Sequence, residues 1–198
     1  KREAGDIPVL PALGNHDFKS RFYQGYLEET RTGPYWSQAE IGGYRFCTLD
    51  TSKEGSPHGT ITNDQTDWLE EILRVPAENG TVLLAHHPLE SRQEWFHTVF
   101  PERFVRVLEH SDVVAYLCGH SHYGEYRSFH GIPQITAESF AYGVETVGND
   151  LLYTETRGYN TCWLRGRELT VHANQTFPFY PVLQRFPLKA ANRPHPPR

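Results

Sequence analysis

The sequence predicts an α/β fold, and two observations carry this prediction. Three almost continuously apolar runs, at residues 7–13, 81–85 and 112–118, are typical of strands covered on both faces. Two other segments, beginning near residues 62 and 101, place apolar residues at helical spacing. With 198 residues, of which 38% are hydrophobic and 22% charged, the chain is long enough for a domain with its own core.

The first apolar run is the least regular of the three strand candidates. Pro8 and Pro11 interrupt it, and proline cannot donate to a sheet ladder, so we expect an edge strand or an irregular one. Further strand candidates lie at residues 44–49, 132–137, 160–164 and 168–173.

Two helices are predicted from their starting residues. Thr62 and Gln65 match a capping box, in which each side chain bonds a free N–H group of the first turn. A second helix should begin at Pro101, and a weaker pattern covers residues 22–29. The apolar faces of the two stronger helices consist of Trp68, Leu69, Ile72 and Leu73 and of Phe104, Val105 and Leu108.

Composition sets the domain organisation and excludes some partners. We expect one domain over residues 1–188 and a disordered proline-rich tail over 189–198. No apolar run approaches the roughly 20 residues of a membrane span. The net charge of −5 argues against nucleic acid as a partner. Three cysteines in apolar stretches are expected to be buried, which is compatible with a reducing compartment such as the cytoplasm; location and oligomeric state stay open.

Histidines gather directly after the three apolar runs. Each histidine alone could equally be a core or surface residue, but in open α/β sheets ligands bind beyond the carboxyl ends of strands. We therefore expect the side chains to converge. Imidazole and amide oxygen suit Mn, Fe or Zn better than Ca, and the lack of thiolates favours an open catalytic site. The histidines concerned are His16, His86, His87, His120 and His122.

These motifs resemble the calcineurin-like metallophosphoesterases, with the class III cyclic-nucleotide phosphodiesterases as the most similar subgroup. The resemblance covers roughly residues 7–173. It implies a layered β-sandwich flanked by helices that lacks its first strand–helix units. The matching segments, in the family's order, are Gly14-Asn15-His16-Asp17, His86-His87-Pro88 and Gly119-His120-Ser121-His122, supported by Leu49-Asp50-Thr51, Gly59 and residues 65–69.

The resemblance implies two divalent or mixed-valence metal ions, Mn, Fe or Zn. Asn15, His86 and His120 would bind one ion, and His122 would bind the other. A hydroxide bridging the ions would attack the phosphorus of a small phosphoester, as a phosphodiesterase or a phosphomonoesterase does. His87 is expected to be a neighbour of the site rather than a ligand.

The same resemblance assigns catalytic roles next to the first motif. His16 would stabilise the charge of the scissile phosphate or protonate the leaving oxygen, and Asp17 would hold the His16 ring. A turn or cap role for Asp17 stays open. Tyr123 and Arg127 are candidate substrate contacts, because tyrosine offers a stacking face and arginine a bidentate fork; packing roles stay open for both.

The family has two earlier motifs, Asp-x-His and Gly-Asp-x-x-Asp. Neither occurs among the fourteen residues that precede Asn15. Without their carboxylates, one metal keeps only His122 and the two cations repel each other. Since the chain also contains no methionine, we expect a longer parent enzyme and weak or no activity from these 198 residues alone.

Two alternatives to a phosphoester hydrolase remain. The fold could be a non-catalytic binding scaffold, or the protein could be a nuclease of the same superfamily. A nuclease requires a basic track beside the site, whereas the chain has four lysines and 15 dispersed arginines. Among substrates, a cyclic nucleotide, a phospholipid headgroup and a general phosphomonoester all stay open.

Overall fold

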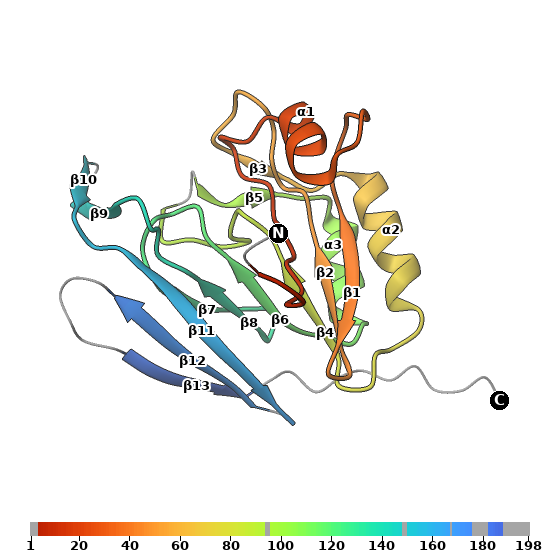
Figure 1. Ribbon diagram of the computed structural model, residues 1–198. Helices are drawn as coiled ribbons and strands as arrows, with labels where there is room; N and C mark the ends of the chain where they lie inside the picture. Colours follow the sequence, from red (N-terminus) through yellow and green to blue (C-terminus); the bar gives the residue numbers. More distant parts are fainter. Residues whose placement is uncertain (1–3, 94–95, 148–149, 167, 176–181, 188–198) are drawn as a thin grey trace.

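The centre of the computed structural model, which describes residues 4–93, 96–147, 150–166, 168–175 and 182–187, is a six-stranded sheet (Figure 1). Its four inner strands β2, β4, β6 and β8 run parallel, while β1 and β7 are antiparallel edges. The mixed sheet confirms the predicted α/β class. In sheet order the strands are β1 (Ser37–Ile41), β2 (Tyr44–Thr48), β4 (Thr81–Leu84), β6 (Val113–Cys118), β8 (Ile132–Thr136) and β7 (Glu125–Phe129).

Helices α2 (Asn63–Leu73) and α3 (Glu102–Glu109) cover one face of this sheet. Leu69, Phe104 and Leu108 are fully buried against the strands, as their helical spacing predicts. Pro101 is the N-cap of α3 rather than its first helical residue.

The predicted capping box at Thr62 is half right. The Thr62 hydroxyl accepts the Gln65 N–H at 3.2 Å. The Gln65 side chain does not return the bond; it accepts the Asp50 N–H at 2.7 Å and donates to the Asp50 carbonyl at 3.1 Å. Gln65 is buried, so its amide satisfies the backbone at the end of β2 instead of the start of its own helix.

A second, antiparallel sheet covers the opposite face of the central sheet. Leu169 and Val171 of this sheet pack against Tyr44, Val82 and Val114 of the central strands. Helices, central sheet and second sheet thus form three layers (Figure 1), which confirms the predicted layered sandwich flanked by helices. The second sheet consists of β11 (Gly158–Arg165), β12 (Glu168–Gln175) and β13 (Val182–Pro187).

Shorter elements complete the upper end of the molecule. Strands β3 (Gly59–Thr60) and β5 (Thr98–Val99) pair in parallel, and β9 (Gly143–Val147) pairs with β10 (Asp150–Thr154) as an antiparallel hairpin. The weak helical pattern corresponds to α1 (Lys19–Phe22) and a π-helical turn, Tyr23–Leu27.

The strand predicted over residues 7–13 is wrong, because this segment forms neither strand nor helix. Pro8 and Pro11 remove two of the donors that a sheet ladder needs. Leu13 is nevertheless buried, in a small cluster with Tyr23 and Tyr35. That contact fixes the segment just before the Gly14-Asn15-His16-Asp17 motif.

The structure tests some of the remaining predictions and leaves others untested. Cys47 and Cys118 are buried as expected, and Cys162 is half-buried. The tail predicted to be disordered, residues 189–198, lies outside the described residues. Within the described part of the chain, no helix combines the length and the apolar character that crossing a membrane requires.

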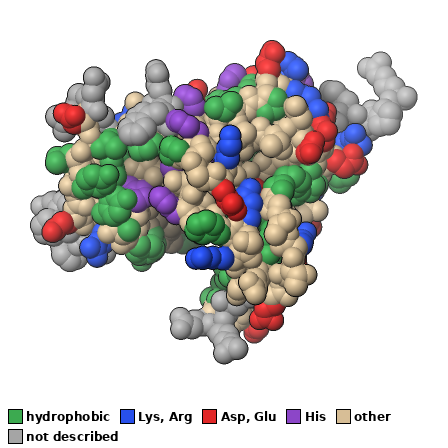
Figure 2. Space-filling view, turned by 90° about the horizontal axis from the view of Figure 1, so that it is seen from above, with side chains coloured by type: hydrophobic (Ala, Val, Ile, Leu, Met, Phe, Trp, Pro, Cys, Tyr) green, Lys and Arg blue, Asp and Glu red, His purple; other side chains and the backbone are tan. Residues whose placement is uncertain are grey.

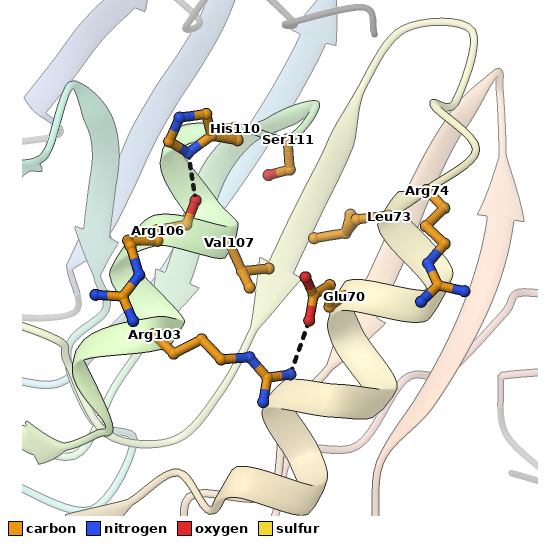
Figure 3. Close-up of a pocket in the computed structure, with 8 residues that line it drawn as sticks. All are labelled: Glu70, Leu73, Arg74, Arg103, Arg106, Val107, His110 and Ser111. Carbon is orange, nitrogen blue, oxygen red and sulfur yellow. Dashed lines mark hydrogen bonds and ion pairs between the residues drawn. The ribbon is translucent and has the colours of Figure 1, made fainter. Parts of the chain in front are cut away.

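A groove with a volume of about 600 Å³ lies between α2 and α3 (Figure 3). Its guanidinium groups already have carboxylate partners: Arg103 bonds Glu70 at 2.7 Å, and Arg106 lies 3.1 Å from Glu102. The groove contains none of the histidines singled out from the sequence.

Candidate metal centre

Three polar side chains from distant parts of the chain meet at one point beyond the central sheet. His86 follows β4 and His120 follows β6, and these strands are parallel neighbours. The Nε2 atom of His86 lies 3.1 Å from Nδ1 of His120 and 3.1 Å from Oδ1 of Asn15. The convergence expected at the carboxyl ends of the strands is therefore present for His86 and His120, and Asn15 joins them from the turn after the irregular segment 7–13.

The spacing of these three atoms fits a shared cation. Two ligand atoms that each lie about 2.1 Å from one metal ion are separated by about 3.0–3.4 Å. Nε2 of His86 carries at most one hydrogen, so a single hydrogen bond cannot account for both of its short contacts. The Nε2 atom of His120 is buried and has no hydrogen-bond partner among the described residues.

The electrostatics of the cluster keep its rings neutral. Burial, assisted by nearby histidines, lowers the pKa of His86 to about 4 and the pKa of His120 to about 3. Burial also lowers the pKa of His122. Neutral imidazole is the form that binds a metal, so these side chains are available as ligands at neutral pH without losing a proton.

The loop after β6 has a strained backbone that is held by the surrounding structure. His120 and His122 have φ angles of 71° and 59°, in the left-handed region that residues other than glycine rarely adopt. The Gly119 N–H donates to the His86 carbonyl at 2.9 Å. His122 Nδ1 lies 3.1 Å from the Tyr142 carbonyl oxygen, and the Val144 N–H donates to the His122 carbonyl at 3.2 Å.

The turn that carries Asn15 packs directly on His86. A Cβ atom added to Gly14 would lie 2.9 Å from Cε1 of the His86 ring, closer than such atoms pack. The Asp17 carboxylate accepts the Gly14 N–H at 2.8 Å, which is the turn role that the sequence left open. Among the described residues no hydrogen bond joins Asp17 to His16, so the ring-holding role of Asp17 stays a prediction.

His87 lies behind the cluster and is fully buried. Its Nδ1 lies 2.8 Å from the Thr51 hydroxyl, and its carbonyl accepts the Tyr116 hydroxyl at 2.8 Å. Burial lowers its pKa to about 2. The ligating atoms of His86, His87 and His120 all lie within 4.8 Å of one another, so His87 is a close neighbour of the candidate ligands.

A cavity of about 220 Å³ opens in front of the cluster. His16, which is exposed, and His122 line it together with Asn15 and His120. Its other walls include apolar and aromatic side chains to which the sequence analysis gave no role: Pro57, Phe96, Tyr142, Val144, Leu151 and Tyr153. Four of them lie within residues 140–153, a segment of mixed apolar and polar residues that carries no recognisable motif.

Viewed from above, histidine side chains lie beside hydrophobic ones at the end of the molecule that carries β9 and β10 (Figure 2). The two candidate substrate contacts are not part of this cavity. Tyr123 is buried, with its hydroxyl 2.6 Å from Ser91 Oγ, and Arg127 is paired with Glu125 at 2.8 Å. Both side chains are thus engaged in packing and pairing within the protein.

Comparison with known proteins gives a consistent result. A probable cyclic nucleotide phosphodiesterase of Rhodococcus erythropolis is 39% identical over 142 residues, covering 69% of this chain and 47% of that protein. A cAMP/cGMP dual specificity phosphodiesterase of Mycobacterium tuberculosis is 38% identical over 135 residues, covering 66% of this chain and 42% of that protein. The chain thus spans about half the length of these curated relatives or less.

Among solved structures, PhoD is similar in fold, with a TM-score of 0.56 and 13% sequence identity; the match covers 84% of this chain and 45% of that one. The sequence profile described as calcineurin-like phosphoesterase matches residues 1–124. Since this match covers more than half of the residues, including all three histidine motifs, the chain belongs to the calcineurin-like phosphoesterase family.

Proposed function

We propose that this protein is a metal-dependent hydrolase of small phosphodiesters, with cyclic nucleotides as the substrate class. The observation that carries the proposal is that His86 Nε2 lies 3.1 Å from both Asn15 Oδ1 and His120 Nδ1. The relatives named as cyclic nucleotide phosphodiesterases support the substrate class.

Asn15, His86 and His120 would hold one divalent cation, Mn, Fe or Zn. His122 would contribute to a second. Donation of its Nδ1–H to the Tyr142 carbonyl leaves Nε2 as the free lone pair. When bound, such cations polarise phosphoryl oxygens and lower the pKa of the water that attacks phosphorus.

The remaining polar side chains position and protonate the substrate. His16 is exposed at the cavity and donates a proton to the leaving alkoxide oxygen. The Asp17 carboxylate, through its bond to the Gly14 N–H, stabilises the turn that presents Asn15 and His16. The left-handed backbone at His120 and His122 places both histidine side chains of this loop in the cavity lining.

One observation favours a second candidate, a binding protein of the same fold without turnover. Among the described residues, the cavity lining contains no carboxylate that could bridge two cations. It also contains no lysine or arginine within the same described set, which does not support a nuclease.

The test compares metal loading and hydrolysis in matched histidine variants. We expect wild-type protein to bind Mn²⁺ and to hydrolyse cyclic AMP and bis-p-nitrophenyl phosphate. In His120→Asn, the affinity for Mn²⁺ and the rate of hydrolysis should each fall by at least about 100-fold. His110→Asn, on the exposed side of the α2–α3 groove, is the control and should match wild type.

The other outcomes either distinguish the hydrolase from the binding protein or contradict both candidates. Binding of Mn²⁺ by the wild-type protein without hydrolysis of either phosphodiester supports the binding protein. Absence of Mn²⁺ binding, or equal binding by wild type and His120→Asn, contradicts both candidates.

A further inference from the structure

The cavity in front of the histidines has a second wall, formed by the hairpin β9–β10. We propose that this wall is a subsite for the planar heteroaromatic base of a nucleotide, with the Tyr153 ring as the stacking surface. The inference rests on the proposed function, since it assigns the phosphate of the same ligand to the histidine cluster.

The register of the hairpin decides which side chains face the cavity. Tyr153 pairs with Val144 across the two strands, so their side chains share a face, and Leu151 shares it because side chains alternate along a strand. All three line the cavity. Leu152 lies on the opposite face by the same alternation and is 55% exposed.

Exposure sets Tyr153 apart from an ordinary packed tyrosine. Its side chain is 66% exposed although it lines the cavity, so the cavity opens to solvent along the hairpin. The Tyr142 ring lies 5.4 Å from the Tyr153 ring at 64°, an edge-to-face contact that supports the Tyr153 ring. An exposed ring beside a phosphate-binding group is the arrangement with which proteins stack nucleobases.

The hairpin is fixed to the histidine loop at short range. The Tyr142 carbonyl accepts from His122 Nδ1 at 3.1 Å, and the Tyr142 ring lies 4.5 Å from the His122 ring. On its other side, Glu145 is paired with Arg92 at 3.4 Å. A ligand whose phosphate contacts the histidines would therefore meet the tyrosine wall at a defined position.

The charge of the wall favours a neutral ring over a cationic headgroup. The described cavity lining offers no carboxylate to pair with an ammonium group, and its nitrogen-bearing side chains are the histidines and Asn15 at the phosphate end. Two tyrosines at one wall provide stacking but do not enclose a quaternary ammonium as an aromatic cage does. A nucleobase is the occupant that fits this chemistry.

The experiment measures binding of three phosphate compounds to the Mn²⁺-loaded protein by calorimetry: AMP, ribose 5-phosphate and phosphocholine. We expect AMP to bind about tenfold more tightly than ribose 5-phosphate, as one base stacked on an aromatic ring predicts. Phosphocholine should bind no more tightly than ribose 5-phosphate. Tyr153→Ala should abolish the preference for AMP and leave the affinity for ribose 5-phosphate unchanged.

Two further variants test whether the effect of Tyr153→Ala comes from the loss of an aromatic ring at this cavity. Tyr153→Phe keeps the ring and should keep the preference. Tyr159→Ala should also keep it, because Tyr159 is 47% exposed but belongs to β11 and does not line the cavity.

The possible failures are distinguishable. Equal binding of AMP and ribose 5-phosphate by wild type, or binding of phosphocholine as tight as that of AMP, overturns the base subsite and leaves the proposed function intact. A Tyr153→Ala variant that dissociates into smaller species in sedimentation, with the AMP preference retained, shows a contact between copies instead. Failure of every phosphate compound to bind overturns the proposed function and this inference together.

Discussion

The Nε2 atom of His86 lies 3.1 Å from Nδ1 of His120, although 34 residues separate the two in sequence. The strands that precede them, β4 and β6, are adjacent and parallel, with Leu84 opposite Leu117. Both histidines therefore follow the sheet at the same end. Burial and mutual proximity keep both rings neutral.

Gly14 is predicted to be required for the position of the His86 ring. Gly14→Ala places a methyl group 2.9 Å from His86 Cε1, so the ring must move and Mn²⁺ affinity should fall about tenfold or more. Gly25→Ala is the control, since a Cβ there meets nothing within 4 Å. Calorimetric titration with Mn²⁺ measures both variants; equal affinities would show that His86 has no part in binding.

Metal binding should stabilise the folded state. At a free Mn²⁺ concentration 100 times the Kd, linkage adds about 2.7 kcal/mol to the free energy of unfolding, and chelation removes it. His86→Asn should reduce this increment, whereas His110→Asn should keep it. Urea unfolding with and without Mn²⁺ measures the increment, and its full retention in His86→Asn would contradict the ligand assignment.

The metal-free protein should lose stability as the pH falls below about 6.5. The pKa of His86 in the folded state is about 4 and that of His120 about 3, below the value of 6.5 expected for an unfolded chain. The unfolded state therefore binds more protons in this window, and the free energy of unfolding falls with decreasing pH, by at most about 1.4 kcal/mol per pH unit and histidine.

Chelator-treated protein unfolded by urea at pH 7, 6 and 5 tests this pH dependence. His86→Asn should show a smaller slope than wild type because one of the two protonation sites is gone. A wild-type stability that does not change between pH 7 and 5 would show that the two rings are not buried as described.

Asp50, which follows β2, is predicted to be the most sensitive carboxylate outside the cavity. Its buried side chain lies 2.9 Å from Lys19 Nζ and accepts the Tyr35 N–H at 2.8 Å and the Ser52 hydroxyl at 2.6 Å. Asp50→Asn leaves the Lys19 ammonium without its carboxylate partner and with only the Ser52 carbonyl, 3.1 Å away, and we expect a loss of about 3 kcal/mol in the free energy of unfolding.

The control for Asp50 is an exposed ion pair. Glu102→Gln breaks the contact with Arg106, in which the glutamate side chain is 90% exposed, and should change stability little. Equal effects of the two substitutions in urea unfolding would contradict the structural role of Asp50.

The histidine convergence could be predicted because it follows from local patterns, whereas the layered sandwich was implied by the resemblance to the phosphoesterase family. Near-continuous apolarity marks β4 and β6 as covered on both faces, and the polar motifs directly after them must emerge at one edge. The strand expected at residues 7–13 failed because its prolines outweighed its apolar character. The Gln65 bond was missed because it depends on the distant backbone of Asp50.

The tyrosine wall was also missed, for a related reason. Tyr142 and Tyr153 reach the histidines through the pairing of β9 with β10 and through a hydrogen bond to the Tyr142 carbonyl. Neither the pairing nor a backbone acceptor leaves a motif in the sequence. Conversely, Tyr123 stands next to the last histidine motif yet is buried outside the cavity, where its hydroxyl contacts Ser91 Oγ.

The most direct test of the account is the position of a bound metal ion. Crystals of the protein grown with Mn²⁺ are measured at the manganese absorption edge. We predict an anomalous-difference peak within about 2.3 Å of Asn15 Oδ1, His86 Nε2 and His120 Nδ1. A peak that contacts none of these three atoms, or no peak from protein that binds Mn²⁺ in solution, would contradict the account.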